Sequence, residues 1–322
     1  MGRPSKRWLQ HNQVAVYAVA VALAVVVALV QPSTQTALEA LVNPVLAVLL
    51  YATFLEIPFV RIRAAFRNAR YLGAALAMNF LVVPVVAFAL TRPLASDPVV
   101  LVGALLVLLT PCIDYVVPFT ELAGGDAEQV TATTPALMVV QLLLLPAYLW
   151  LFVGPQAAAV VDARPFVEAF AYLIAVPLTA AYLTERRAEH SERAREWQDA
   201  VEWLPVPAMA ATLFVVIASQ LPRVQDALGR VASVVPVYVA FLVAMPLLAS
   251  AAGRRLDVDT GASRALVFTS VTRNSLVVLP LALALPAEYA LAPAVVVTQT
   301  LVELCGMVAL TRVVPAYLVP ER

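Results

Sequence analysis

Long apolar runs recur along the whole chain and are separated by short polar segments. A helix that crosses a bilayer needs about 20 apolar residues, and only helices and closed barrels satisfy their backbone hydrogen bonds within hydrocarbon. The pattern predicts an all-α integral membrane protein with ten transmembrane helices. The predicted spans are residues 13–31, 36–59, 71–91, 98–119, 130–153, 166–184, 204–221, 232–252, 266–285 and 291–315.

Composition supports the membrane assignment and limits the functions to consider. Hydrophobic residues make up 62% of the 322 residues and charged residues 13%, whereas soluble domains average about 45–50% and about 25%. The formal net charge is zero, so we expect the lipid bilayer as a partner and no nucleic acid. The sequence contains no phosphate-binding loop, nucleophile elbow or metal-ligand spacing. We therefore expect no enzymatic activity, no cofactor and no resident metal.

Basic residues alternate between the loops and thereby indicate the orientation of the chain. With a cytoplasmic N-terminus, sixteen of the 21 Lys and Arg residues fall in inner segments and four in outer loops. Because cytoplasmic loops are enriched in Lys and Arg, both termini are predicted to be cytoplasmic, in the cell membrane. The longest charged stretch, residues 185–203, is then a cytoplasmic connector between spans six and seven that contains a short helix. The remaining basic residue, Arg273, falls within a span.

Two predicted spans, the fourth and the ninth, are interrupted by polar residues at equivalent positions. Many secondary transporters consist of two inverted repeats that bind their substrates at discontinuous helices. We therefore predict two inverted five-helix halves, residues 1–160 and 161–322, whose fourth and ninth helices cross near the membrane midplane. The residues at the two breaks are Thr110, Pro111, Cys112 and Asp114 in the first half, and Thr272, Arg273, Asn274 and Ser275 in the second.

Charged side chains at both breaks predict an interaction between them. An isolated charge at the centre of a transmembrane helix costs roughly 2.5–3.5 kcal/mol, so such residues usually pair or line a wet cavity. If the broken helices cross, Asp114 and Arg273 would meet and lower each other's cost of burial. In the alternative interpretation, each residue faces water separately near the end of a half-helix.

The stretch LLTPCIDYVVPFTELAGGDAEQV, with a cysteine directly after a proline in a broken fourth span, resembles the arsenite efflux permeases of the arsenical-resistance family. These permeases belong to the bile acid/sodium symporter superfamily. The resemblance continues through VNPVLAVLLYATFLEIP, MNFLVVPVVAFAL, VFTSVTRNSLVVLPLALAL and VVVTQTLVELCGMVAL, and so covers nearly the whole chain in the right order. It implies an exporter of arsenite or antimonite in which Cys112 and Glu303 match the two residues that the family requires.

Arsenite chemistry suits a single cysteine. Trivalent arsenic is soft and prefers thiolate sulfur, and one sulfur with oxygen ligands binds weakly enough to release the substrate. Cys112 is therefore the predicted arsenite ligand and Glu303 the predicted carrier of a proton, which makes protons the expected coupling ion of an antiporter. Sodium-coupled relatives carry a glutamate and a glutamine where this chain has Thr269 and Arg273. A guanidinium at that place argues against sodium coupling there.

Several alternatives stay open from the sequence. The first is a carrier of organic or inorganic anions in which Arg273 holds the anion and Cys112 is incidental, and the second is a membrane sensor without transport. Cys305 is interpreted as a packing residue without a disulfide, and a homodimer is left open. Six polar residues lie within the predicted spans. They either line the path of a transported solute or form hydrogen bonds to neighbouring helices, and the sequence favours neither role: Asn79, Thr131, Thr134, Gln141, Ser219 and Gln299.

Overall fold

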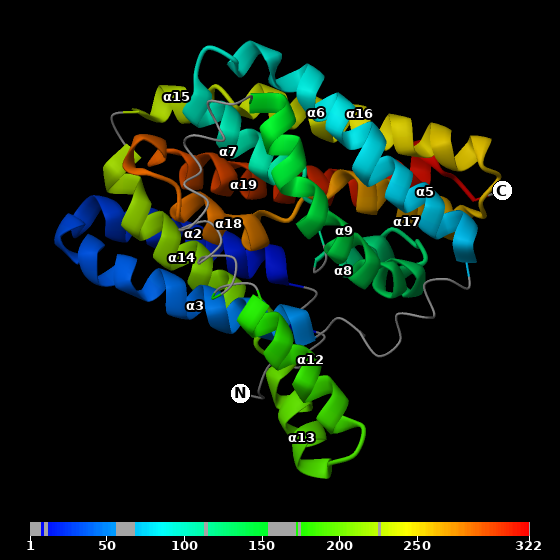
Figure 1. Cartoon of the computed structure of the whole chain (residues 1–322), viewed down its shortest axis with the longest axis horizontal. Helices are drawn as coiled ribbons and strands as arrows, with labels where there is room; N and C mark the ends of the chain where they lie inside the picture. Colours follow the sequence, from blue (N-terminus) through cyan, green and yellow to red (C-terminus); the bar gives the residue numbers. More distant parts are fainter. Residues whose placement is uncertain are drawn as a thin grey trace. The chain divides into compact units, whose positions relative to one another are not determined.

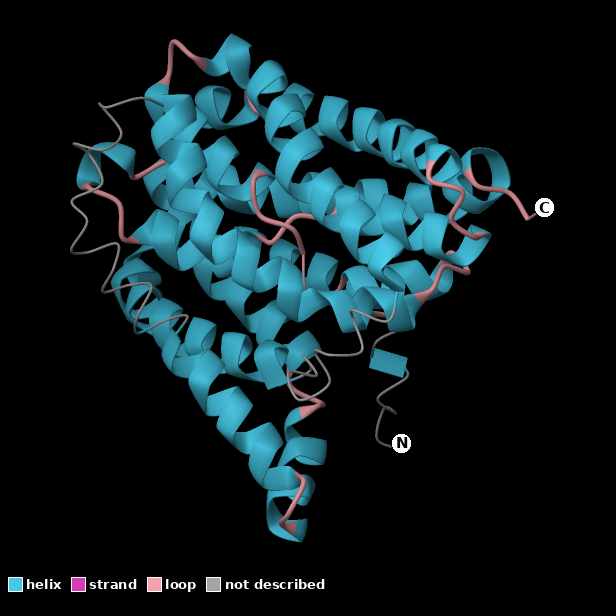
Figure 2. Ribbon diagram, turned by 45° about the vertical axis from the view of Figure 1, so that its right-hand side comes forward, coloured by secondary structure: helices cyan, strands magenta, loops and turns pink. Residues whose placement is uncertain are grey.

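The computed structural model describes residues 8–9, 12–55, 68–112, 115–153, 172, 175–224 and 227–321. Within these ranges the regular structure is helical, and no strand is present (Figure 2). The all-α prediction is therefore confirmed. Each predicted span overlaps a helix or a pair of helices separated by a break, although most of residues 166–175 lie outside the described part of the chain.

Five described helices are long and apolar enough to cross a membrane, and a sixth is added if residues 127–153 count as one bent span. The chain is thus a multi-pass membrane protein, while the count of ten spans stays a prediction. The fourth and ninth predicted spans miss the length criterion because each is broken into two shorter helices. The five long helices are Gln35–Leu55, Ala69–Leu94, Pro205–Pro222, Leu228–Arg255 and Ala287–Leu318.

The chain forms two compact units, and the first comprises Met1–Glu56 and Ala163–Gly229. Helix α14 packs against both α2 and α3, and α12 packs against α3. The short helix α13 lies within the charged stretch and is fastened to α3, because Trp197 Nε1 donates a hydrogen bond of 2.9 Å to the Tyr51 hydroxyl. The elements are α2 (Gln13–Val30), η1 (Pro32–Thr34), α3 (Gln35–Leu55), α12 (Val176–Ala188), α13 (Glu192–Val201) and α14 (Pro205–Val224).

The second unit comprises Ile57–Asp162 and Arg230–Arg322, so each unit draws segments from both halves of the chain. Its centre is formed by α7 and α17, which are buried along nearly their whole length and pack on α19 and α16 respectively. Figure 1 labels its main helices. The elements are α5 (Ala69–Ala77), η4 (Met78–Val82), α6 (Val83–Thr91), η5 (Arg92–Leu94), α7 (Pro98–Leu108), α8 (Val116–Leu122), α9 (Ala127–Val153), α16 (Val235–Arg255), α17 (Thr260–Val271), α18 (Ser275–Leu283), η8 (Ala287–Tyr289), α19 (Ala292–Val313) and η9 (Val314–Leu318), with α15 (Leu228–Ala232) at the boundary.

The two central helices α7 and α17 begin in the same way. Asp97 Oδ1 accepts the backbone N–H of Val100 at 3.3 Å, and Asp259 Oδ1 accepts that of Ala262 at 2.9 Å. Such N-caps satisfy amide groups that a helix leaves without a partner at its start. The two caps are 162 residues apart, since 259 − 97 = 162. The two helices therefore correspond in register as well as in length.

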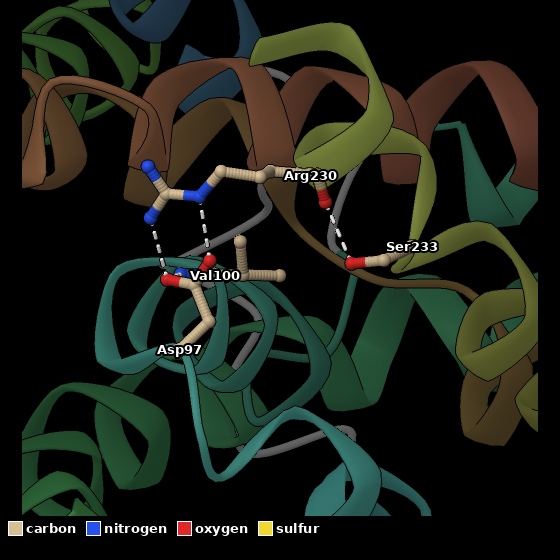
Figure 3. Close-up of polar contacts among 4 residues, drawn as sticks. All are labelled: Asp97, Val100, Arg230 and Ser233. Carbon is tan, nitrogen blue, oxygen red and sulfur yellow. Dashed lines mark hydrogen bonds and ion pairs between the residues drawn. The ribbon is translucent and has the colours of Figure 1, made fainter.

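The N-cap of α7 also forms an ion pair at the helix end. Arg230 Nε lies 2.8 Å from Asp97 Oδ2, and Arg230 Nη2 lies 2.8 Å from Asp97 Oδ1 (Figure 3). The Ser233 hydroxyl donates to the Arg230 carbonyl oxygen at 2.6 Å. The hydrogen bonds from Arg230 hold the pKa of Asp97 below its usual value. The segment that precedes α16 is thereby attached to the start of α7.

Replacing Asp97 should cost more stability than replacing its partner. Asp97→Ala removes the N-cap, which is worth about 0.5–2 kcal/mol, together with the ion pair, whereas Arg230→Gln removes the ion pair alone. We expect a larger fall in melting temperature for Asp97→Ala in detergent. A carboxylate with a lowered pKa stabilises the protein above its unfolded pKa of about 3.9, and this contribution disappears as the pH falls through the lowered value. The effect of Arg230→Gln should therefore shrink in acid, and equal melting temperatures for both variants would contradict the capping role.

Candidate functional site

The two helix breaks lie against each other through reciprocal backbone hydrogen bonds. Cys112 N donates to Thr272 O at 3.1 Å, and Asn274 N donates to Thr110 O at 2.8 Å. Pro111 and Arg273 face each other between these bonds in an isolated antiparallel bridge. Each bonded residue is again 162 positions from its equivalent, since 272 − 110 = 162 and 274 − 112 = 162. The breaks thus satisfy each other's backbone groups reciprocally.

Side chains at the breaks stabilise the adjoining helix ends. The hydroxyls of Thr110 and Thr272 both bond back to a carbonyl four residues earlier, at 3.2 and 2.8 Å. Asn274 caps the next helix, because its Oδ1 accepts the N–H of Val277 at 3.1 Å. The Thr300 hydroxyl donates to Ser275 Oγ at 2.6 Å and so joins α19 to the start of α18.

The Arg273 guanidinium is completely buried and is surrounded by oxygen atoms. Four of these are carbonyl oxygens at the C-terminal ends of α7 and α17, where helix dipoles place partial negative charge. The ring of Phe241 lies beside it, 5.4 Å from Cζ to the ring centroid. The hydrogen-bond acceptors are Leu108 O (3.3 Å), Thr269 O (3.0 Å), Ser270 O (2.8 Å), Val271 O (3.4 Å) and Asn79 Oδ1 (2.8 Å).

Asn79 reaches this guanidinium from η4, a π-helical turn that joins α5 to α6. Pro84 follows that turn, and a proline has no N–H to donate to the carbonyl four residues earlier. That carbonyl, of Phe80, instead accepts the Tyr148 hydroxyl at 2.5 Å. The Asn79 amide nitrogen donates to Ala75 O at 3.0 Å, which leaves Oδ1 for Arg273. The irregular turn therefore supports the position of the buried arginine.

Glu303 is buried in α19 and contacts the second break through both carboxyl oxygens. Oε2 accepts hydrogen bonds from the backbone N–H of Arg273, at 2.9 Å, and from Gln299 Nε2. Oε1 lies 2.7 Å from the Tyr115 hydroxyl, and the same hydroxyl lies 3.0 Å from Arg273 O. Because Oε2 already accepts two donors, a proton on this carboxyl group belongs on Oε1.

The structure brings together most of the residues that the sequence singled out. Asp114 lies outside the described residues, so its pairing with Arg273 stays a prediction. Cys112 is buried, whereas Cys305 is exposed on a different face of α19 from Glu303. The residues assembled at the breaks are Thr110, Pro111, Cys112, Thr272, Arg273, Asn274, Ser275 and Glu303.

Sequence reasoning missed three members of this assembly as site residues. Asn79 and Gln299 were noted only as polar residues within apolar spans. A polar residue surrounded by apolar sequence was the signal that could have identified each of them as a site residue. Tyr115 stands three residues after Cys112 in the first break, where no spacing rule pointed to Glu303 as its partner. Among the described residues, no group of three or more His, Cys, Asp and Glu side chains could hold a metal ion.

Comparison with known proteins gives one family match. A model of the Sodium Bile acid symporter family matches residues 43–226. The match covers 226 − 43 + 1 = 184 of the 322 residues and includes the first break and the turn that carries Asn79. A search of curated proteins found no match to the chain.

Removing Asn79 should destabilise the protein mainly through Arg273. A buried hydrogen bond to a charged group contributes about 1.5–3 kcal/mol, so we expect a loss of that order in the free energy of unfolding of Asn79→Ala. In an Arg273→Gln background the same change should cost clearly less. Denaturant titration of the four proteins in detergent gives the coupling. Thr91→Val is a suitable control, because its buried hydroxyl bonds only to carbonyls of α6, and equal costs of Asn79→Ala in both backgrounds would contradict the interaction.

Proposed function

Because the chain belongs to the Sodium Bile acid symporter family, we propose that it is a proton-coupled carrier that exports arsenite or antimonite without sodium. Members of the family are secondary transporters and not enzymes, so transport is driven by gradients. In alternating access, the bound solute faces one side of the membrane at a time. The observation that carries the proposal is the Tyr115 hydroxyl between the Glu303 carboxyl group and the Arg273 carbonyl oxygen.

The surroundings of Arg273 support the proposed independence from sodium. Hard cations such as sodium select oxygen ligands, and the five oxygen atoms around this guanidinium would suit such an ion. The guanidinium already supplies one positive charge there. A carrier with this fixed cation needs no metal ion to balance the partial negative charge of the carbonyl oxygens at the C-terminal ends of α7 and α17. Sodium would then have no effect on transport.

The position of Tyr115 supports the proposed proton coupling. When Glu303 is ionised, Tyr115 donates its proton to Oε1 and the Arg273 carbonyl loses this donor, because one hydroxyl carries one proton. When Oε1 is protonated, it donates to the Tyr115 oxygen, and Tyr115 then donates to the Arg273 carbonyl. Protonation of Glu303 would thus change which hydrogen bond holds the second break. That change links the charge of the Glu303 carboxyl group to the backbone of the second break, which is hydrogen-bonded to the backbone of Cys112.

Cys112 supplies the chemistry for a soft solute. Its backbone N–H is bonded to Thr272 O, which holds the residue at the junction of the two breaks. Arsenite that exchanges one hydroxyl for the thiol sulfur forms one sulfur–arsenic bond and releases one water, with the thiol proton completing that water. A single sulfur ligand allows the reverse reaction to release the solute on the other side.

The wider architecture of the proposal is two inverted five-helix halves, residues 1–160 and 161–322, with both termini cytoplasmic in the cell membrane. The constant separation of 162 residues supports the repeat. It relates the caps Asp97 and Asp259 as well as the backbone-bonded residues of the breaks. The excess of basic residues in the alternate loops supports the orientation.

A second candidate, export or uptake of an organic anion, is favoured by the family description, which names bile acids. The Arg273 guanidinium is a poor receptor for such an anion. Its contacts engage at least four of its five N–H groups, whereas bidentate binding of a carboxylate needs two that are available. An anion would therefore be held by other groups.

Uptake of arsenite into everted membrane vesicles tests the proposal directly. We expect uptake that depends on a pH gradient and is unchanged when potassium replaces sodium. Cys112→Ser should lose most of the uptake, because serine offers a hard oxygen in place of sulfur. Glu303→Gln should abolish the dependence on the pH gradient. Cys305→Ser is the matched control and should transport normally, since this cysteine is exposed on α19.

Three results would contradict parts of the proposal. Undiminished arsenite uptake in Cys112→Ser would exclude thiol ligation, and uptake of cholate but not of arsenite would favour the organic-anion carrier. A requirement for sodium would contradict the role given to Arg273.

A further inference from the structure

Gln141 differs from the other polar residues within the predicted spans. Of the six such residues, two bond to the site, Asn79 to Arg273 and Gln299 to Glu303. Three others, Thr131, Thr134 and Ser219, bond to carbonyls of their own helices. Gln141 is 1% exposed, and neither its Oε1 nor its Nε2 has a hydrogen-bond partner in the described part of the chain.

An amide group buried in this way is unfavourable unless something else binds it. Its donor and acceptor lose their hydrogen bonds to water on burial and gain none in return. Bonding between neighbouring helices, the simplest reason for a polar residue in a span, is not observed for Gln141. The side chain therefore offers two N–H donors on Nε2 and one acceptor oxygen, Oε1, to a ligand.

The repeat of 162 residues relates Gln141 to Glu303, since 303 − 141 = 162. Their helices also have equivalent neighbours. Helix α9 packs on α8 as α19 packs on α18, and α9 packs on α17 as α19 packs on α7. Glu303 Oε2 accepts the backbone N–H of Arg273. The residue equivalent to Arg273 is Pro111, which has no N–H to donate. The symmetric hydrogen bond is thus missing on the side of the first break, where Cys112 follows the proline.

We propose that Gln141 hydrogen-bonds the transported solute at the first break, beside Cys112, as the uncharged counterpart of Glu303. The ligand class is a small, hydroxyl-bearing neutral molecule, for which the amide donates from Nε2 and accepts at Oε1. Arsenite, with hydroxyl groups that both donate and accept, fits this class. The inference rests on the proposed function and assigns it a further solute-binding residue.

Gln141→Leu separates a binding role from a structural one. Leucine has a similar size and removes an unsatisfied buried amide, so the melting temperature should stay equal or rise. Loss of one hydrogen bond to the solute should raise the KM for arsenite about 3- to 10-fold in proteoliposomes, with little change in kcat. Thr134→Val is the matched control on the same helix and should leave KM unchanged, because the Thr134 hydroxyl bonds to its own helix at Val130 O.

The inference is wrong if Gln141→Leu transports arsenite with an unchanged KM, whether its melting temperature rises or falls. A fall would indicate an internal water as the partner of Gln141, and a rise would indicate an unsatisfied group without function. Failure of the proposed function gives a different result. If the wild-type protein carries cholate and not arsenite, the neutral ligand class assigned to Gln141 is wrong. A raised KM for cholate in Gln141→Leu would then support only a solute-binding role for Gln141, and an unchanged KM would refute that role as well. Transport of neither solute by the wild-type protein would refute both proposals.

Discussion

The burial of one positive charge, that of Arg273, is the constraint on which the second compact unit depends. A buried guanidinium is tolerated only when its N–H groups are bonded and its charge is compensated. Compensation requires the ends of α7 and α17 to meet, because their terminal carbonyl oxygens are the main acceptors. It also requires the turn at Asn79, which comes from a third segment of the chain. Three structural features, the ends of α7 and α17 and the turn at Asn79, are therefore linked through a single side chain.

The broken helices solve a second problem in the same place. A helix that ends inside a membrane leaves carbonyl and N–H groups without partners, and such backbone is tolerated only where protein or water satisfies it. Thr110 and Thr272 each give one carbonyl to the opposite break, and Cys112 and Asn274 each give one N–H. The backbone of Cys112 and the carboxyl group of Glu303 therefore belong to one hydrogen-bonded junction. Glu303 joins it because its carboxyl group accepts a hydrogen bond from the backbone N–H of Arg273.

Hydropathy predicted much of this fold because the helices alternate with polar loops of ordinary length. The breaks were also predictable, since Pro111 and Arg273 interrupt apolar runs at equivalent positions. Hydropathy gives the order of helices but not their neighbours, and for that reason it could not reveal two compact units that each combine segments from both halves. The contact between Asn79 and Arg273 joins residues 194 positions apart, and it depends on a π-helical turn that no periodic pattern encodes. The partners of Arg273 and Glu303 therefore required the structure.

The two breaks share a reciprocal backbone arrangement but differ in their side-chain chemistry. At the second break, Arg273 contributes both a backbone N–H for Glu303 and a cation for the surrounding carbonyl oxygens. At the first break, Pro111 contributes neither, and the residue 162 positions before Glu303 is the neutral Gln141. The buried cation and the buried carboxyl group thus both lie at the second break. The first break has a thiol, and we propose that it acts together with the Gln141 amide, since these uncharged groups could bind a neutral solute without a counter-ion. In the proposed carrier, the coupling group Glu303 would be separate from the binding groups Cys112 and Gln141, and the pair of backbone hydrogen bonds between the breaks would connect them.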